Sequence, residues 1–393
     1  MISLRRGPLA TLAAVGVFSP ALGRAAAQVP NIRVAGRIQS QYRLSSGDST
    51  GNYNAGLVSN GFEIRRLRIQ TDVRFGDNVN LVIQPSFEMG ALRMRDAFLR
   101  VGLTPRLGVS VGQEKSPFQR YELNSSNNLL SVERGLRILR LSGREGLNDL
   151  LVNNGYASHD LGAFLDFETP DHRFQAKAGL QNGARESTAD VNNAKSFFGR
   201  ATYVALKNTD DQPVLQLGGS VAARDRAIQC VGPGCPATGY YADSSKQAMA
   251  FGLDLEWGGF RPGVHVIADF ATGDNVPLTR RINSGRNTGN LRNSSDTNLV
   301  TFRGVSLIGA YRIMTTGADT RVVKIVEPAL RVDATDPDVD TNGDGGVLIT
   351  PVLNIYFANS VILRAGVDYY RYKDATGTNR SARELKFSWQ ANF

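Results

Sequence analysis

The chain has 393 residues and a formal net charge of +9, with 45 Lys and Arg against 36 Asp and Glu. Charged residues make up 21% of it and the mean hydropathy is −0.22. Beyond residue 27, no continuous apolar run is long enough for a membrane-spanning helix. These values exclude a helical membrane protein, but they fit a membrane-spanning β-barrel, in which only alternate residues face lipid.

The start of the chain has the features of a cleaved signal peptide. A basic Arg5-Arg6 pair precedes a short apolar stretch, and three alanines offer a small-residue cleavage site before Gln28. The apolar stretch is too short to span a bilayer. We therefore expect residues 1–27 to be removed on export and residues 28–393 to form a single barrel domain.

The first two segments after the leader, 32–44 and 62–75, alternate between apolar and polar residues. A β-strand shows one face to each side, so each segment has one apolar and one polar face. The polar faces carry Arg33, Arg37, Arg43, Arg66, Arg68 and Arg74. A guanidinium facing lipid at mid-membrane would cost roughly 2–4 kcal/mol, so we expect these side chains to face a lumen. Arg65 has the opposite parity to Arg66, and a bulge or snorkelling would be needed to redirect it.

Sixteen such segments can be placed along the chain, an even number, as a single-chain bacterial barrel requires. The other fourteen are 79–89, 94–103, 106–113, 159–168, 174–181, 196–206, 214–223, 247–257, 263–271, 301–313, 322–333, 348–357, 361–372 and 383–393. The last has apolar residues at every second position back from Phe393, and this ending resembles the closing strand of an outer-membrane barrel.

The connectors between these segments alternate between short turns and long loops, apart from a short link at 90–93. This alternation is typical of the periplasmic and extracellular ends of outer-membrane barrels. We therefore predict an all-β fold, a 16-stranded antiparallel transmembrane barrel. The longest connector, 115–158, is the third long-end loop and contains an amphipathic stretch with Arg137. We expect it to fold into the lumen, because long ordered loops are usually functional.

Two loop motifs suggest further sites. Cys230 and Cys235 are separated by a Val-Gly-Pro-Gly link, and in an exported protein we expect them to form a disulfide. A metal site would need two more ligands nearby. Separately, Asp338, Asp340, Asn342 and Asp344 have the spacing of the first half of a calcium loop, but the bidentate acid expected eleven residues after Asp338 is replaced by Ile349. We assign no metal, and weak calcium binding and a plain acidic loop remain the alternatives.

Several stretches, taken together, resemble the phosphate-selective porin family of the O and P type. They are Phe-Glu-Ile-Arg-Arg-Leu-Arg-Ile at 62–69, Leu-Arg-Met-Arg-Asp-Ala-Phe-Leu at 92–99, Val-Gly-Gln-Glu-Lys-Ser-Pro-Phe at 111–118, Leu-Asn-Ser-Ser at 123–126 and Val-Glu-Arg at 132–134. The resemblance implies a homotrimeric, sixteen-stranded barrel with an arginine-lined anion path. It covers most of the mature chain and is strongest over residues 61–135.

By this resemblance, Arg65, Arg66 and Arg134 match basic residues near the family's constriction, and Asp96 matches an acid beside it. The chain departs from the phosphate-specific members at Glu122, where they carry a lysine, and it has only eight lysines in all. The departure leaves the channel prediction intact and bears only on phosphate specificity.

We therefore predict an outer-membrane diffusion channel for anions, with phosphate or polyphosphate foremost. Arginine suits such a path because it stays charged and offers oxyanions a planar fork of donors. We place the selectivity point at Arg66 and Arg134. A general porin with little ion preference, whose inward arginines merely pair with inward acids, and an adhesin or structural barrel remain alternatives.

The expected partners are inorganic anions, outer-membrane lipid, lipopolysaccharide and further copies of the chain. We expect no cofactor, no nucleic-acid partner and no enzymatic activity. The chain has only three histidines, and none lies in a convincing arrangement with a serine nucleophile.

Overall fold

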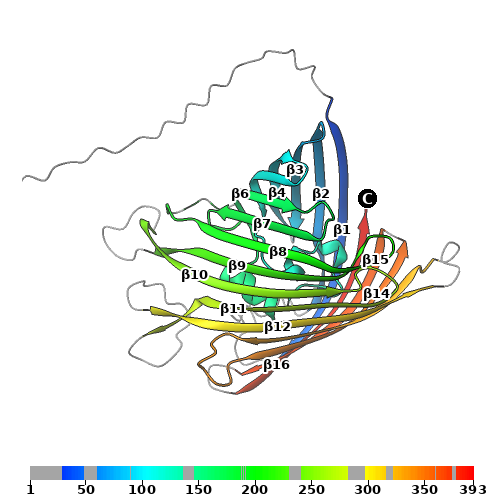
Figure 1. The fold of residues 1–393 in the computed structure, drawn as a ribbon. Coiled ribbons are helices and arrows are strands. Elements are labelled where there is room, and N and C mark those ends of the chain that lie inside the picture. The colour runs from blue at the N-terminus through cyan, green and yellow to red at the C-terminus, as the bar shows by residue number, and fades with distance from the viewer. Residues whose placement is uncertain are drawn as a thin grey trace, which may run out of the picture.

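The computed structural model describes residues 29–47, 60–88, 90–135, 146–186, 188, 190, 192–229, 240–281, 297–315, 322–358, 360–373 and 378–393. The predicted signal peptide, Arg137 and the pair Cys230 and Cys235 lie outside these residues. The described strands form one closed antiparallel barrel in which neighbours along the chain are neighbours in the sheet (Figure 1). The predicted sixteen-stranded barrel is confirmed.

The strands are β1 (Asn31–Gly47), β2 (Asn60–Phe75), β3 (Val79–Glu88), β4 (Ala91–Thr104), β5 (Leu107–Lys115), β6 (His159–Glu168), β7 (Phe174–Gln181), β8 (Ser196–Lys207), β9 (Pro213–Gln229), β10 (Tyr240–Trp257), β11 (Gly263–Arg281), β12 (Thr297–Met314), β13 (Ile325–Asp336), β14 (Gly346–Ala358), β15 (Val361–Lys373) and β16 (Asn379–Asn392).

The first and last strands close the barrel. β1 pairs with β16 from Arg37, opposite Asn392, to Gly47, opposite Ala382. Figure 1 shows the blue β1 beside the red β16. The backbone amide of Gly36 donates to the carbonyl of Phe393 at 2.7 Å, and the amide of Phe393 donates back at 2.9 Å. A Cβ at Gly36 would lie 2.4 Å from the Phe393 ring. The terminal aromatic residue therefore packs where only glycine leaves room.

The alternation of β1 and β2 sets the two surfaces of the wall as the sequence predicted. On β1, Ile38 and Leu44 are exposed on the outer surface, whereas Arg37, Gln39 and Gln41 are buried inside. Polar side chains point inward and apolar side chains point outward around the rest of the barrel. On β16, for example, Phe387 and Trp389 are exposed on the outer surface. The outer surface is therefore suited to lipid and the inner surface to water and charge.

Several strands are longer than their hydrophobic alternation indicated. β11 reaches Arg281 instead of residue 271, and β10 begins at Tyr240 instead of residue 247. Backbone pairing continues beyond the membrane into polar stretches, where a strand needs no apolar face. The apolar–polar alternation of the sequence therefore locates the part of each strand in the apolar band but not the strand ends. The exceptional link between β3 and β4 is tighter than expected, because β3 ends at Glu88 and β4 begins at Ala91.

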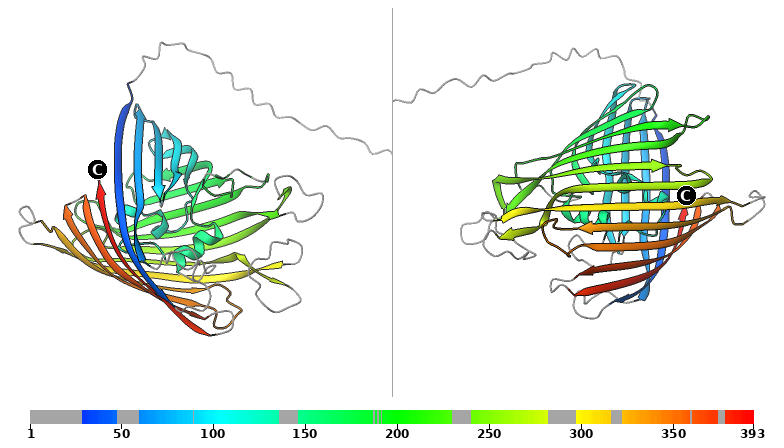
Figure 2. Two further views of the ribbon diagram at one scale, coloured as in Figure 1. Left: turned by 180° about the vertical axis from the view of Figure 1, so that it is seen from behind. Right: turned by 60° about the horizontal axis from the view of Figure 1, so that its bottom comes forward.

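The described parts of the third long-end loop, residues 116–135 and 146–158 and here called loop 3, lie inside the barrel, as predicted. It contains α1 (Arg120–Leu123), a 3-10 turn η1 (Ser126–Asn128) and α2 (Leu147–Asn154), and Figure 2 shows these helices within the ring of strands. Among the described residues, no helix is long and apolar enough to cross a bilayer.

Loop 3 is fixed to the wall by an apolar cluster. Phe118, Leu147, Leu150, Leu151 and Tyr156 of the loop pack against inward residues of β8 to β12. Those wall residues are Phe198, Ala222, Ala248, Ala250, Ala271 and Phe302. Small inward alanines at these positions leave space for α2, so the wall and the loop are matched in shape.

The docking of loop 3 can be tested at Leu151, which is fully buried. We expect Leu151→Ala to weaken docking by about 2–5 kcal/mol, because the residual cavity adds to the lost burial. The loop should then leave the lumen more often, and single-channel recordings should show a larger and noisier conductance. Leu307→Ala makes the same chemical change on the lipid-facing side of β12 and should leave conductance unchanged. Equal conductance in both variants would contradict this packing role.

Candidate functional site

The inner wall of β2 presents a run of arginines towards loop 3. In the pairing of β1 with β2, Gln39 lies opposite Arg66 and Ser40 lies opposite Ile64. Arg65 is therefore the extra residue of a β-bulge, which turns its side chain inward. Its Nε donates to Glu133 Oε1 at 2.5 Å. The open question of where Arg65 points is answered by this bulge.

The carboxylate of Glu133, carried by loop 3, joins two neighbouring arginines. It accepts from Arg65, and it also accepts from Arg66 Nη2 at 2.7 Å. Gln39 Oε1 accepts from Arg66 Nη1 at 2.8 Å. Arg66 and Glu133 are both almost fully buried. Loop 3 thus places its own anionic group on the arginine pair that the sequence singled out.

A second carboxylate, Glu88 at the end of β3, gathers three more contacts. It accepts from Arg68 Nη2 and from Arg95 Nη2, each at 2.5 Å, and Arg65 Nη1 lies 3.5 Å away. Arg95 was not predicted as a site residue. It is the extra residue of a bulge on β4, between the pairs Gln84–Asp96 and Pro85–Met94.

A sequence signal for the inward position of Arg95 does exist on the partner strand. Pro85 has no backbone N–H to donate to the ladder, and prolines within sheets are confined to edges, strand starts and bulges. A proline opposite the Leu-Arg-Met-Arg-Asp stretch therefore indicates a break in the alternation.

Arg134 and Lys115 hold the turn around α1. Arg134 Nη2 donates to the carbonyl of Asn124 at 2.5 Å, and its Nε lies 3.4 Å from Glu122 Oε2. Lys115 Nζ donates to the carbonyl of Glu122 at 2.5 Å. Burial alone would raise the pKa of the Glu122 carboxyl, but Arg134 and Lys115 lower it to about 2. Glu122 is therefore ionised at neutral pH.

Arg37 is the cation of this region that has no acidic partner. Its Nη1 donates to Asn127 Oδ1 in η1, and no carboxylate of the described chain lies within ion-pair distance of it. The charged groups that act on it most strongly are Arg68, Arg66 and Arg134, all of them positive, and Glu88 opposes them less strongly. Arg37 is nevertheless almost fully buried. The local potential around it is therefore strongly positive.

Asn127 ties loop 3 to the seam of the barrel. Arg364 Nη2 donates to its backbone carbonyl at 2.8 Å, and Gln390 Nε2 donates to its Oδ1 at 3.2 Å. These contacts join η1 to β15 and β16, while the apolar cluster joins α2 to the opposite wall. Loop 3 is thus held from both sides of the lumen.

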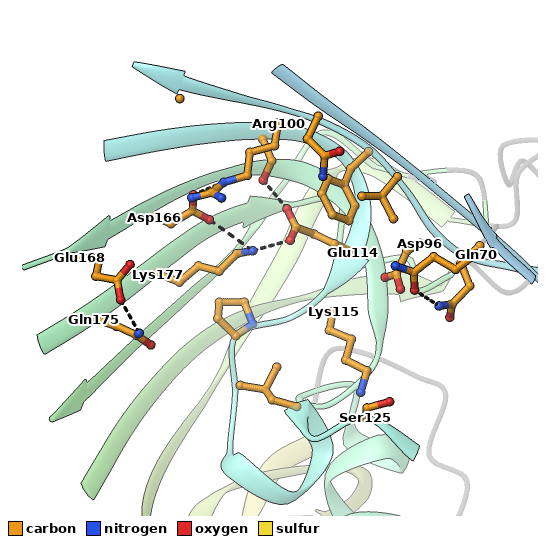
Figure 3. Close-up of a pocket in the computed structure, with 18 of the residues that line it drawn as sticks. Gln70, Asp96, Arg100, Glu114, Lys115, Ser125, Asp166, Glu168, Gln175 and Lys177 are labelled. Carbon is orange, nitrogen blue, oxygen red and sulfur yellow. Dashed lines mark hydrogen bonds and ion pairs between the residues drawn. The ribbon is translucent and has the colours of Figure 1, made fainter. Parts of the chain in front are cut away.

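Below loop 3, a cavity of about 1450 Å³ is lined by β1 to β9, α1 and η1 and reaches the short turns at 76–78 and 105–106. Its lining includes nine Lys and Arg residues against five Asp and Glu. Figure 3 shows an alternating chain along one side, formed by Arg100, Asp166, Lys177 and Glu114. Charges along that chain largely cancel, whereas β1 and β2 contribute Arg37, Arg68 and Arg74 to the lining.

The other predicted residues lie away from the arginine cluster or beside it. Asp96 faces His159, with 3.3 Å between Oδ1 and Nε2. Arg33 lies near the short-turn end, in register with Asp72, and so belongs to the lumen entrance. Elsewhere in the barrel, inward cations do pair with acids, as the alternative of a cross-linked lumen supposed. Examples are Arg200 with Asp254, Arg312 with Glu327 and Lys386 with Asp368.

The calcium-like segment forms part of the β13–β14 loop. Asp338 Oδ1 accepts from the amide of Asp340 at 3.2 Å, and its Oδ2 accepts from Thr341 Oγ1 at 2.8 Å. Within the described ranges, no group of three or more His, Cys, Asp or Glu residues is placed to hold a metal ion. Asp338 thus serves the turn itself, and the two alternatives for Asp338, Asp340, Asn342 and Asp344, weak calcium binding and a plain acidic loop, stay open.

A closed barrel with an apolar exterior, a charged interior and an inward-folded third loop is the architecture of an outer-membrane porin. The chain belongs to the family described as phosphate-selective porin O and P, whose model matches residues 32–236, just over half of its length. The family predicted from the sequence motifs is therefore confirmed. No curated protein sequence matches the chain.

Solved structures with the same fold include three outer-membrane proteins. The channel DcaP of Acinetobacter baumannii has a TM-score of 0.58 at 12% identity, covering 93% of this chain and 97% of its own. An anion-selective porin from Comamonas acidovorans has a TM-score of 0.55 at 11% identity, covering 93% and 100%. A trimer form of OmpT from Vibrio cholerae has a TM-score of 0.50 at 12% identity, covering 93% and 99%. At these identities the likeness concerns the fold alone.

The Glu133 carboxylate offers a direct test of the charge balance beside loop 3. We expect Glu133→Gln to raise the anion-to-cation permeability ratio, because Arg65 and Arg66 lose their shared counter-charge. A unit charge about 8 Å from a passing ion in water-like surroundings is worth about 0.5 kcal/mol, with opposite signs for an anion and a cation. The permeability ratio should therefore change roughly fivefold at low salt, and less as screening increases. The measurement is the reversal potential in a planar bilayer under a salt gradient.

Glu327→Gln is the matched control, because Glu327 is a buried, inward carboxylate paired with Arg312 on another part of the wall. It should change the reversal potential less than Glu133→Gln does. A shift of the Glu133→Gln channel towards cations would contradict the assigned role.

Proposed function

We propose that this outer-membrane channel passes small anions in preference to cations, with phosphate or polyphosphate as the foremost cargo. The observation that supports the proposal is the uncompensated positive charge around Arg37, beside the inward loop. The cations there are Arg37, Arg65, Arg66, Arg68, Arg95, Arg134 and Lys115, and the acids are Asp96, Glu63, Glu88, Glu122, Glu133 and Glu186. Cations exceed acids by one, and Arg37 is the cation without an ion-pair partner among the described residues. Such an excess lowers the energy of an anion and raises that of a cation at the same point.

An anion in a narrow passage loses part of its hydration, and fixed donors must replace it. Arg37 can supply such donors without first releasing a carboxylate, whereas Arg65 and Arg66 are already bound to Glu133. An incoming oxyanion must compete with Glu133 for that arginine pair. This competition favours weak, transient contacts, which suit rapid diffusion better than tight capture. We therefore shift the predicted selectivity point from Arg66 and Arg134 alone to a cluster that includes Arg37.

We further propose that the chain is exported by its first 27 residues and assembles as a homotrimer. The signal-like composition of the leader supports the first part. The existence of a trimer form of OmpT, which has the same fold, supports the second. Crosslinking of membranes that contain the protein, followed by denaturing electrophoresis, would reveal the number of copies.

Arg37→Gln is the sharpest test of the proposed anion preference. We expect the anion-to-cation permeability ratio to fall roughly fivefold at low salt, because one uncompensated charge near the passage is lost. Arg33→Gln removes the same charge from the same strand, nearer its exposed end, and should have a smaller effect. Reversal potentials of both variants under one salt gradient decide the matter. Equal shifts in the two variants would remove the special role of Arg37.

The double replacement Arg66→Ala with Arg134→Ala tests the wider cluster. It removes two cations and takes one close arginine from each of Glu133 and Glu122. The excess of one cation should become a deficit of one, and anion preference should fall further than in Arg37→Gln. Planar-bilayer recordings with and without added phosphate would measure both selectivity and block. Unchanged selectivity would favour a general porin, and negligible conductance of the unaltered protein would favour an adhesin or structural barrel.

A further inference from the structure

The outer surface of the last hairpin carries two cations at the long-loop end. Arg371 on β15 and Arg383 on β16 are both exposed and both have the outward parity of their strands. The guanidinium carbon of Arg371 lies 5.1 Å from the ring centre of Tyr369, and that of Arg383 lies 5.2 Å from it. Tyr369 and Arg383 are directly opposite each other in the sheet. One tyrosine thus holds two guanidinium groups at one place on the barrel exterior.

These two arginines lack acidic partners. No carboxylate of the described chain lies within ion-pair distance of either guanidinium. Arg371 Nε donates to the hydroxyl oxygen of Tyr369 at 2.7 Å, so most of its donors remain available. Stacking on an aromatic ring restrains a guanidinium and leaves its N–H edge free for an oxyanion. Two like charges held together in this way favour an anionic ligand.

The position of the pair along the barrel places it at the lipid headgroups. Outward residues below it are apolar, with Val361 and Val367 on β15 and Phe387 and Trp389 on β16. Tyr369 is eight residues above Val361, which is roughly 20 Å along the membrane normal for a strand tilted by about 40°. The apolar band of such barrels is about 25 Å tall. Tyr369 therefore lies near its upper boundary, and Arg371 lies one outward position above it.

A groove of about 820 Å³ is lined in part by Arg371. It runs between the β13–β14 loop and the upper ends of β15 and β16, and its lining includes Tyr369 and Arg371. The remaining lining includes the uncharged polar residues Thr341, Asn342, Asn379 and Ser381, the cations Lys373 and Arg380, and the acids Asp336 and Asp344. Hydroxyl and amide groups of this kind suit the hydroxyls of a sugar. The outward side chains of Val347 and Ile349 lie beside it, facing the apolar band.

We propose that Arg371, Arg383 and this groove form a binding site for a phosphorylated glycolipid of the outer leaflet. The two guanidinium groups bind the phosphate, the groove receives the sugar, and the acyl chains lie along the outward apolar residues of β14 and β15. Anionic headgroups are attracted to arginines at the membrane surface by the same charge-assisted hydrogen bonds that bind other oxyanions. The site lies on the lipid side of the wall and does not depend on the ion preference of the lumen.

The test uses the full-length protein, refolded in detergent and mixed with purified lipid A for native mass spectrometry. The unaltered protein should retain diphosphorylated lipid A and should bind a fully dephosphorylated form at least about tenfold more weakly, since two charge-assisted contacts are lost. Arg371→Ala with Arg383→Ala should abolish this difference. Arg371→Lys with Arg383→Lys keeps the charge but not the planar fork, and should bind with intermediate strength.

Arg173→Ala with Arg261→Ala is the matched control, because it removes two cations from the short turns at the opposite end. It should retain lipid A fully. The heat-dependent gel mobility of each variant reports whether the barrel is folded. If the double alanine variant does not fold, lipid A binding by the lysine variant and by the two single alanine variants tests the proposal instead. Equal retention by folded alanine variants would overturn the proposal. Displacement of lipid A by equimolar inorganic phosphate would also overturn it. So would a double alanine variant that no longer forms oligomers but still binds lipid A.

Discussion

A chain that crosses hydrocarbon has no water to satisfy its peptide groups, so its backbone must satisfy itself. In this protein the requirement is met by sixteen strands that close through β1 and β16. Closure then fixes the direction of each side chain, because successive residues of a strand point to opposite sides of the wall. The arginines of β1 and β2 face inward for this reason, and the charge of the lumen is a consequence of the architecture.

The lumen gains its specific character from loop 3 and not from the wall alone. The loop is held by an apolar cluster on one side and by Asn127 on the other. It brings Glu133 to Arg65 and Arg66, and it leaves Arg37 with an amide oxygen for a partner. Positive charge is thus partly neutralised and partly left available. A surface balanced in this way can attract anions while releasing them readily, which is what a diffusion channel requires.

Much of this arrangement could be predicted from the sequence. Alternation placed Arg37, Arg66 and Arg68 inside, because the cost of a charge in lipid allows no other choice. The length and position of the 115–158 connector indicated an inward loop. Motifs such as Phe-Glu-Ile-Arg-Arg-Leu-Arg-Ile indicated the family. Each of these signals is local, or it follows from the order of elements along the chain.

The remaining features depend on contacts between distant parts of the chain. The bulges that turn Arg65 and Arg95 inward arise from the pairing of two strands, so no alternation within one strand reveals them. Glu133 and Arg65 are 68 positions apart in the sequence, and neither segment carries a pattern that indicates contact with the other. In the sequence alone, the alanines that pack against α2 give no indication that they contact a helix. Only the folded barrel shows that Ala248, Ala250 and Ala271 make room for a helix.

The central claim is that fixed cations beside loop 3 exceed the acids that face them. The zero-current potential of the unaltered channel across a tenfold gradient of potassium chloride tests it most directly. The account predicts a potential whose sign corresponds to chloride crossing more readily than potassium, with a magnitude that shrinks as total salt rises and screening increases. A potential of zero at low salt, or one of the opposite sign, would contradict it.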